Sequence, residues 1–313
     1  IEGWGFFIFI AVIPISILIT FYNILKAINT QKCYYPFSIP FLKQTKTDLG
    51  TKLFAVLVGS LLVLTSCTSN KVGDIIRLDE TTITKDSLTA KMNQLIDDAN
   101  VHGIAVTVFN NNQIAYHNTF GYKDYQKKLV LTDTTNIYGA SFSKAVFGVL
   151  VMKLVEDGVI DLDTPLESYL PKKIHEYEPK TRWHDDFSSL KNDSLYAKIT
   201  ARMCLTHTTG FVNSRWFEPD YQLRIHGIPG SRYSYSGEGF VYLQVVLEHL
   251  LDKNLEELAQ QIIFEPLNMQ NSSYQWLTVF ENNFAYGHNA KGELFIKDKD
   301  NEPRGGSTLE TTA

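Results

Sequence analysis

Hydrophobic residues are distributed along this chain in two ways, and each way predicts a different kind of segment. Two long apolar runs, Phe6–Ile19 and Leu53–Leu64, precede everything else. From Asp86 onward, short apolar stretches alternate with polar ones, as in a packed domain. The pattern predicts four parts: an upstream hydrophobic segment at 1–45, a signal segment at 46–67, a polar tether at 68–85 and a globular domain at 86–313.

The second apolar run is too short to span a bilayer, but it has the length of the hydrophobic region of a signal peptide. Three lysines precede it, and Leu64–Cys67 follows it with the sequence Leu-Thr-Ser-Cys. This ending resembles the bacterial lipobox, which implies that Cys67 is lipidated; the alternative is a buried or reactive free thiol. We therefore expect a lipoprotein of the bacterial cell envelope, anchored in the membrane, with its domain outside the cytoplasm.

The first apolar run conflicts with this interpretation, because a signal peptide should begin the protein. Phe6–Ile19 and the mixed residues up to Ile28 could just form a transmembrane helix, despite Pro14. The first methionine is Met92, inside the domain. Two interpretations stay open. Residues 1–45 are either upstream reading frame, with a non-Met start near Lys46–Leu53, or they contain a genuine transmembrane helix that a second membrane segment follows.

The domain begins with a helix and a hairpin. Apolar residues recur at helical spacing between Leu88 and Ala99. Ile104–Phe109 and Ile114–Phe120 are rich in β-branched and aromatic residues around an Asn110–Asn112 turn, which predicts a β-hairpin. A long helix at Ser141–Asp157 is apolar nearly all round, so we expect it to be buried.

The second half of the domain is predicted to be helical. Helices are expected at Ile199–Leu205, Gly239–Leu251 and Leu255–Ile263, and the polar stretch Lys172–Ala197 is expected to be an exposed excursion. Asn254 and Glu257 form a capping box for the last of these helices. A two-stranded sheet alone is marginal, so the fold needs more strands than this pattern supplies.

Ser141–Lys144 has the form Ser-x-x-Lys, which suits an acyl-transfer nucleophile. Residues three apart share a helix face, so the Lys144 amine can approach the Ser141 hydroxyl and take its proton. Free N–H groups at the same helix start, including that of Ser141, can hold an oxyanion. The plainer interpretation is a serine helix cap with a solvated lysine. The same form recurs at Ser188–Lys191, but there in a polar stretch without an apolar helix.

Composition narrows the possible partners. The 313 residues are 44% hydrophobic and 20% charged, which is ordinary for a globular domain. A net charge of −5 without a basic stripe makes nucleic acid an unexpected partner. Cys33, Cys67 and Cys204 are too few and too scattered for a disulfide framework or a metal knuckle. Acyl-serine chemistry at Ser141 implies no metal and no organic cofactor.

The run from Tyr138 through Ser141 and Lys144 to Pro171 closely resembles the nucleophile helix of the serine β-lactamase-related, penicillin-recognising family. That family includes class C β-lactamases, DD-peptidases and esterases. The resemblance implies an α+β fold of the β-lactamase/transpeptidase type, with an antiparallel sheet flanked by helices and a helical subdomain. It also implies Ser141 as nucleophile, Lys144 as its lysine, and a small-molecule or peptidoglycan-like substrate.

Later blocks are similar to the same family. Leu205–Gly210 resembles its Leu-Thr-His-Thr-Ser-Gly turn, where we expect His207 to order the turn rather than act as a base. Pro229–Gly237 resembles its second motif, which places Tyr235 as the catalytic tyrosine and Tyr233 as a packing residue. Gly237 stands where the family has Asn, which weakens any specific expectation of β-lactam or peptide amide substrates and leaves esters open.

The family's third motif, Lys-Thr-Gly or His-x-Gly, does not follow Tyr235 in this chain. Residues 305–313 resemble the glycine-rich segment that normally precedes it. We therefore expect a fragment that lacks the final strands and the C-terminal helix, inactive alone and a hydrolase when complete. Two functions follow from the sequence: an acyl-serine hydrolase, or a non-catalytic penicillin- or peptidoglycan-binding sensor of the same fold.

Overall fold

The computed structural model describes residues 74–180, 185–289 and 291–313. The predictions made for the two apolar runs, for Cys33 and for Cys67 lie outside these residues. Within the described part of the chain, no helix has both the length and the hydropathy needed to cross a membrane.

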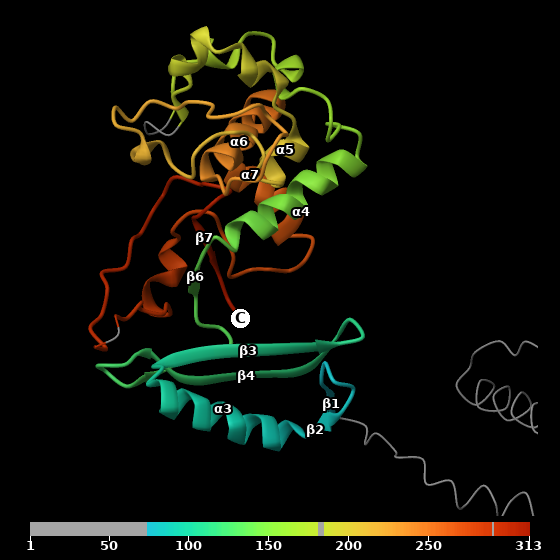
Figure 1. Cartoon of the computed structure of the whole chain (residues 1–313). Helices are drawn as coiled ribbons and strands as arrows, with labels where there is room; N and C mark the ends of the chain where they lie inside the picture. Colours follow the sequence, from blue (N-terminus) through green and yellow to red (C-terminus); the bar gives the residue numbers. More distant parts are fainter. Residues whose placement is uncertain (1–73, 181–184, 290) are drawn as a thin grey trace, which may run out of the picture. The chain divides into compact units, whose positions relative to one another are not determined.

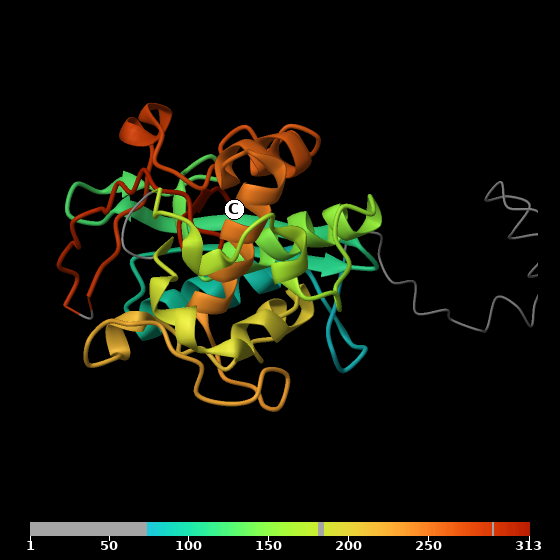
Figure 2. The same ribbon diagram turned by 90° about the horizontal axis from the view of Figure 1, so that it is seen from above.

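The N-terminal part of the domain is a small sheet with one long helix. β3 (Gly103–Asn110) and β4 (Gln113–Asp124) form the predicted antiparallel hairpin, and β5 (Leu129–Val130) extends it on the β4 side. The turn is made by Asn111 and Asn112, both with left-handed backbone. α3 (Lys85–Ala99) runs along the hairpin in Figures 1 and 2 and packs Leu88, Met92 and Ile96 against it.

Residues that were predicted to belong to the tether are partly folded. β1 (Ile75–Ile76) pairs with β2 (Thr82–Ile83), and the Ile75 side chain is buried against the hairpin. The Ile76 N–H donates to Asn110 Oδ1 at 2.8 Å. Residues 75–83 of the predicted tether therefore form a short two-stranded ribbon, which the buried Ile75 side chain packs against the hairpin.

A second sheet joins segments far apart in the sequence. β6 (Ile137–Ala140) leads into α4 (Ser143–Glu156) and pairs antiparallel with β7 (Leu309–Thr311), so the two strands lie side by side in Figure 1. A bulge interrupts the pairing between Tyr138 and Ala140. β5, β6 and β7 have two to four residues each, too few to show the alternation by which a strand is predicted.

The remaining helices pack around α4. α5 (Ala201–Leu205), α6 (Gly237–Leu251) and α7 (Leu255–Ala259) are followed by a π-helical turn at Gln260–Phe264. The Asn254–Glu257 capping box is present as predicted. Short 3-10 helices make most of the connections: Leu166–Tyr169, Ile174–Glu176, Ser188–Asn192, Ser194–Lys198, Arg215–Phe217 and Thr278–Asn282.

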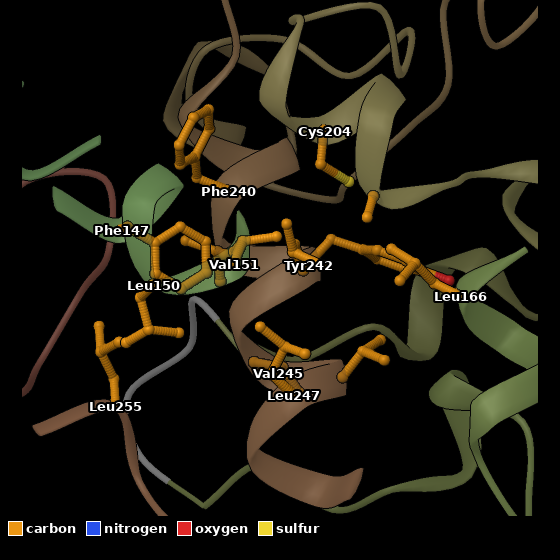
Figure 3. Close-up of a cluster of buried hydrophobic side chains, with 14 of the residues drawn as sticks. Phe147, Leu150, Val151, Leu166, Cys204, Phe240, Tyr242, Val245, Leu247 and Leu255 are labelled. Carbon is orange, nitrogen blue, oxygen red and sulfur yellow. The ribbon is translucent and has the colours of Figure 1, made fainter. Parts of the chain in front are cut away.

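The main core lies between α4, α5 and α6, as Figure 3 shows. Phe147 and Leu150 of α4 meet Tyr242 of α6 in a continuous buried cluster. α4 is less buried than predicted, because Val149 and Met152 are 56% and 47% exposed. α6, in contrast, is buried on nearly every side over Glu238–Leu247.

The prediction that Lys172–Ala197 is an exposed excursion is wrong. Four apolar side chains spaced along the described part of this stretch, Ile174, Phe187, Leu190 and Tyr196, are buried in the main core. In this stretch, single apolar side chains pack into the core, and the residues between them are mostly polar. The broader prediction of an α+β fold with antiparallel sheets and a helical part is confirmed.

Candidate active site

Ser141 lies in the turn between β6 and α4. The preceding residue, Ala140, has a left-handed φ of 43°, a strained conformation that costs a non-glycine residue about 1–3 kcal/mol. α4 begins at Ser143, two residues later than predicted, because Ser141 belongs to this turn. The Lys144 N–H still donates to Ser141 O at 3.1 Å, so the helix-like spacing between the two residues is kept.

Ser143, inside the motif, holds this turn in place. Its side chain is fully buried, and its hydroxyl donates to Ala140 O at 2.5 Å and accepts from Leu309 N–H of β7 at 2.9 Å. The Tyr274 hydroxyl donates to Ser143 O at 2.8 Å. Three hydrogen bonds at Ser143 therefore hold the strained turn. No sequence pattern indicated this role for Ser143.

The structure brings the three predicted residues together. Ser141 Oγ lies 2.8 Å from the Tyr235 hydroxyl oxygen, and Lys144 Nζ donates to Ser141 Oγ at 3.3 Å. Lys144 Nζ also donates to Gly306 O at 2.6 Å and lies 4.9 Å from the centre of the Tyr235 ring. The Ser141 hydroxyl, the Lys144 amine and the Tyr235 phenol thus form one hydrogen-bonded cluster. They come from two segments that are far apart in the sequence.

The surroundings of Tyr235 favour loss of its proton. Partial burial by itself raises the pKa of the phenol, but the hydrogen bonds to Lys144 and Ser141 and the lysine charge outweigh that effect. The net result is that the pKa of Tyr235 lies below its ordinary value. A phenol of lowered pKa within hydrogen-bonding distance of a serine hydroxyl can take the serine proton.

His207 supports Tyr235 from behind. The Ser236 N–H donates to His207 Nδ1 at 3.0 Å, and the imidazole ring packs on the Tyr235 ring with 4.5 Å between centres. Burial and the nearby Lys144 charge lower the pKa of His207 more than its hydrogen bond to Ser236 raises it. His207 Nδ1 lies 3.0 Å from the backbone nitrogen and 3.2 Å from the carbonyl oxygen of Ser236, so the ring links its own turn to the segment that carries Tyr235. Its role in ordering the turn stays a prediction.

A buried ion pair ties the next loop to the start of α6. Arg215 and Glu238 are 3% and 4% exposed, and Arg215 Nη2 donates to Glu238 Oε2 at 2.7 Å. The Arg215 N–H also donates to Glu238 Oε1, and the guanidinium donates to Asp186 O. Three segments therefore meet at this pair, which no sequence pattern indicated.

A cavity of about 380 Å³ opens beside these groups. Ser141 is exposed on its wall and Tyr235 is 39% exposed, so the nucleophile is reachable from solvent. The Ser141 N–H donates to no acceptor among the described residues, which leaves it available for an oxyanion. The cavity is lined by Ser141, Lys144, Asn213, Ser214, Trp216, Tyr235, Gly237, Glu238, Val241, Arg304, Gly306 and Ser307.

The second Ser-x-x-Lys sequence forms no comparable group. Ser188 begins a 3-10 helix, where its N–H donates to Asp186 Oδ1, and its neighbour Ser189 donates to Leu223 O. Among the described residues, Ser188 and Lys191 share no hydrogen bond. Cys204 is fully buried, and burial raises the pKa of its thiol well above the ordinary range, which makes it a packing residue.

Comparison with known proteins assigns this chain to a family. The family model described as Beta-lactamase matches residues 88–311, most of the chain. The chain therefore belongs to the Beta-lactamase family.

Two curated relatives come from Staphylococcus aureus. Protein flp of strain N315 is 22% identical over 207 residues, 65% of this chain and 41% of that protein. Teichoic acid D-alanine hydrolase of strain MRSA252 is 24% identical over 238 residues, 72% of this chain and 54% of that protein. The chain thus spans about half the length of these relatives or less.

Among solved structures, D-alanine carboxypeptidase AmpC from Burkholderia cenocepacia superposes with a TM-score of 0.58 at 19% identity. The match covers 73% of this chain and 60% of that one. At this identity the likeness establishes the fold. The predicted β-lactamase/transpeptidase-like fold is confirmed by this match together with the family match.

Proposed function

We propose that the protein carrying this sequence is a serine hydrolase that acts through an acyl-serine intermediate. The observation that supports it most is the group formed by Ser141, Lys144 and Tyr235, with Ser141 Oγ 2.8 Å from the tyrosine hydroxyl and 3.3 Å from the lysine amine. Membership of the Beta-lactamase family, whose relatives include a protein named as a hydrolase, agrees with this assignment.

The reaction follows from the positions of these groups. Ser141 Oγ attacks the carbonyl carbon while its proton passes to Tyr235, and Lys144 stabilises the phenolate by its charge. The Ser141 N–H donates to the developing oxyanion. The bond to the leaving group breaks, Tyr235 returns the proton to that group, and water then hydrolyses the acyl-serine by the same route.

The substrate class is an ester, a β-lactam or a peptide amide. Gly237 supports the ester, because this position has no side chain to hold a substrate amide as the family's Asn does. The relative named for teichoic acid D-alanine and the structural neighbour named for D-alanine agree with an acyl group of the D-alanine type. No metal or organic cofactor takes part in the proposed steps.

The proposal is tested in the whole protein as its cell produces it. Labelling with a fluorophosphonate and with a fluorescent penicillin is expected for the wild type and is expected to disappear in Ser141→Ala. Ser188→Ala is the matched control, because it removes the serine of the other Ser-x-x-Lys sequence and should leave labelling intact. Labelling that survives in Ser141→Ala contradicts the proposal.

A non-catalytic sensor that binds penicillin or peptidoglycan is the second candidate. Gly237 favours it, because a site without the family's Asn has lost a group that contacts the substrate and the lysine. Intact mass spectrometry after mixing with penicillin separates the two functions. An acyl adduct on Ser141 that persists for hours favours the sensor, whereas an adduct that forms and disappears with product release favours the hydrolase.

We also propose that the protein is a lipoprotein of the bacterial envelope, anchored through Cys67. The basic residues, the apolar run and the Leu-Thr-Ser-Cys ending support this anchor. Cys67→Ser should abolish incorporation of labelled palmitate and move the protein from the membrane fraction to the soluble fraction. Unchanged palmitate labelling in Cys67→Ser would contradict the anchor.

A further inference from the structure

We propose that Tyr274 is a positioning residue that ties together the two segments between which the Lys144 amine lies. One segment is the turn that carries Ser141, and the other is the stretch 304–308, which carries Gly306. Tyr274 acts through its contacts with both segments. This inference rests on the proposed acyl-serine function and adds a residue that keeps its proton-transfer groups in place.

The Lys144 amine is placed by acceptors from two segments that are far apart in the sequence. Its Nζ donates to Ser141 Oγ at 3.3 Å and to Gly306 O at 2.6 Å. The amine keeps both bonds only while the two acceptors keep their spacing. A residue that fixes this spacing therefore fixes the lysine, whose charge stabilises the Tyr235 phenolate.

The first observation is the contact of the Tyr274 side chain with the start of α4. Tyr274 is fully buried, and its hydroxyl donates to Ser143 O at 2.8 Å. The backbone N–H of Phe147 also hydrogen-bonds to this hydroxyl. Burial raises the pKa of Tyr274 well above its ordinary value, so the hydroxyl keeps its proton and its bond does not titrate in a neutral or mildly alkaline assay.

The second observation is that the backbone of the same residue is held by other segments. Tyr274 O accepts from the Thr308 hydroxyl at 2.6 Å. Tyr274 N–H donates to Glu256 Oε2 of α7 at 2.6 Å, and this glutamate is buried. Ser273 and Glu310 exchange two backbone hydrogen bonds, at 3.0 and 2.8 Å, which hold the same stretch beside β7. Tyr274 is therefore fixed at its backbone as well as at its hydroxyl.

These contacts make Tyr274 a rigid link between the two acceptors of the lysine. The bond from Leu309 N–H to Ser143 Oγ joins the same segments at β7, and Tyr274 adds a second contact that limits rotation about that bond. The turn before Ser143 is strained at Ala140, so a lost contact allows it to relax. Displacement of a catalytic group by about 1 Å can cost about 10²-fold in rate. Tyr274 does not line the cavity, so its effect on the reaction is indirect.

The first test uses the whole protein as its cell produces it, with 4-nitrophenyl acetate as substrate. Tyr274→Phe removes the hydroxyl and keeps the ring in the core, and it should lower kcat/KM by about 10–100-fold. Tyr242→Phe is the matched control, because Tyr242 is also fully buried but its hydroxyl has no hydrogen-bond partner among the described residues. That variant should keep a kcat/KM near the wild-type value.

A second readout separates positioning from stability. If Lys144 moves away, its charge stabilises the Tyr235 phenolate less, so the pKa of Tyr235 should rise toward its ordinary value in Tyr274→Phe. NMR titration of the whole protein, labelled with ¹³C at the tyrosine Cζ atoms, measures this pKa, and Tyr235→Phe identifies the signal. A purely structural role, in a variant that stays folded during the titration, would leave the pKa of Tyr235 unchanged.

The other end of the link is cut in Thr308→Val, and Thr308→Ser keeps the hydroxyl. This hydroxyl also accepts from Arg304 N–H at 2.8 Å, so both bonds are lost in Thr308→Val and both are kept in Thr308→Ser. We expect Thr308→Val to lower kcat/KM as Tyr274→Phe does, and Thr308→Ser to stay near the wild type. Because either change breaks the same link, the double variant should be no slower than the slower single variant, whereas independent contacts would multiply their effects.

Each outcome decides the inference. A kcat/KM that falls in Tyr274→Phe but not in Tyr242→Phe, together with a raised pKa of Tyr235, supports it. An unchanged pKa of Tyr235 in Tyr274→Phe, an unchanged kcat/KM there, or multiplied effects in the double variant overturns it. If the wild type shows no turnover that depends on Ser141, the proposed function fails, and the NMR titration alone decides whether Tyr274 places Lys144.

Discussion

The two parts of the domain differ in how many polar side chains they bury. In the part made of β1, α3 and the β3–β4 hairpin, the buried residues described are the apolar Ile75, Tyr116 and Phe120 and one charged residue, Asp124, and no residue of α3 is buried. Side-chain hydrogen bonds such as that between Thr107 and His117 lie at its surface. Around α4 and α6, in contrast, serine, glutamate and arginine side chains are buried and hydrogen-bonded.

This difference indicates why the candidate site lies where it does. A surface hydrogen bond contributes little, because water replaces it easily, whereas a buried polar group that loses its partner costs about 1–3 kcal/mol. Buried Ser143 and Glu238 both have hydrogen-bond partners from other segments in the observed arrangement. The part of the molecule with most of the buried polar residues is the part that holds Lys144 and Tyr235 within hydrogen-bonding distance of Ser141.

The largest expected effect is on catalysis at the centre of the buried network. Tyr235→Phe removes the proton carrier and should lower kcat by about 10²–10⁴-fold. Because the pKa of Tyr235 is lowered, the phenolate form accumulates as pH rises toward a value below the ordinary 10, so wild-type kcat/KM should rise with pH there. That rise should vanish in Tyr235→Phe. Tyr233→Phe, at a neighbouring exposed tyrosine, is the control, and an equal loss there would contradict the role of Tyr235.

The next effect is on stability, at the buried ion pair. Glu238→Gln removes the carboxylate charge that faces the buried Arg215 guanidinium and should reduce the free energy of unfolding by about 3–5 kcal/mol, measured by urea denaturation. The matched control is Asp163→Asn, which breaks a bidentate pair with Arg202 whose side chains are 64% and 53% exposed. That change should have little effect on the free energy of unfolding, because water screens the exposed pair. If the two variants lose the same free energy of unfolding, the buried ion pair stabilises the fold no more than the exposed pair does.

Two kinds of sequence feature predicted residues of the candidate site: a short motif in its helical context, and a resemblance to a known family. Ser-x-x-Lys occurs twice, and the apolar helix after Ser141 distinguished it from Ser188 because a nucleophile needs a rigid support. Tyr235 was placed through family resemblance, and the structure puts its hydroxyl 2.8 Å from Ser141 Oγ. The catalytic roles themselves stay predictions until the variants are measured.

The contacts that hold the site could not be predicted in the same way. Ser143 and Leu309 are 166 positions apart, and Arg215 and Glu238 are 23 apart, so no period along one element relates them. Hydrophobic periodicity reports which face of an element is buried, but not which polar residues of other elements meet there. For the same reason the four buried residues at 172–197 were hidden by the polar residues around them.

A smaller effect is expected where a single buried hydroxyl supports the strained turn. Ser143→Ala leaves the Leu309 N–H without its acceptor and should destabilise the fold by about 1–3 kcal/mol in thermal or urea unfolding. Ser141 should shift with the turn, so kcat should fall more than the stability loss alone explains. Ser168→Ala removes a hydroxyl that also bonds the carbonyl three residues earlier, but at an exposed site, and should cost little. A Ser143→Ala protein of wild-type activity would show that the turn holds without this clamp.

The smallest effect is expected in the hairpin part, and it is the most direct way to test the comparison. Leu150 in α4 is fully buried, whereas Leu95 in α3 is 46% exposed. Leu150→Ala should cost about 2–5 kcal/mol, because it removes apolar contacts and leaves a cavity that the surrounding core fills only in part. Leu95→Ala should stay within about 0.5 kcal/mol, because water already contacts that side chain. If the two changes shift the urea midpoint equally, the side chains of α3 are packed as tightly as those of α4. Closer packing around α4 would then not explain why the candidate site lies there.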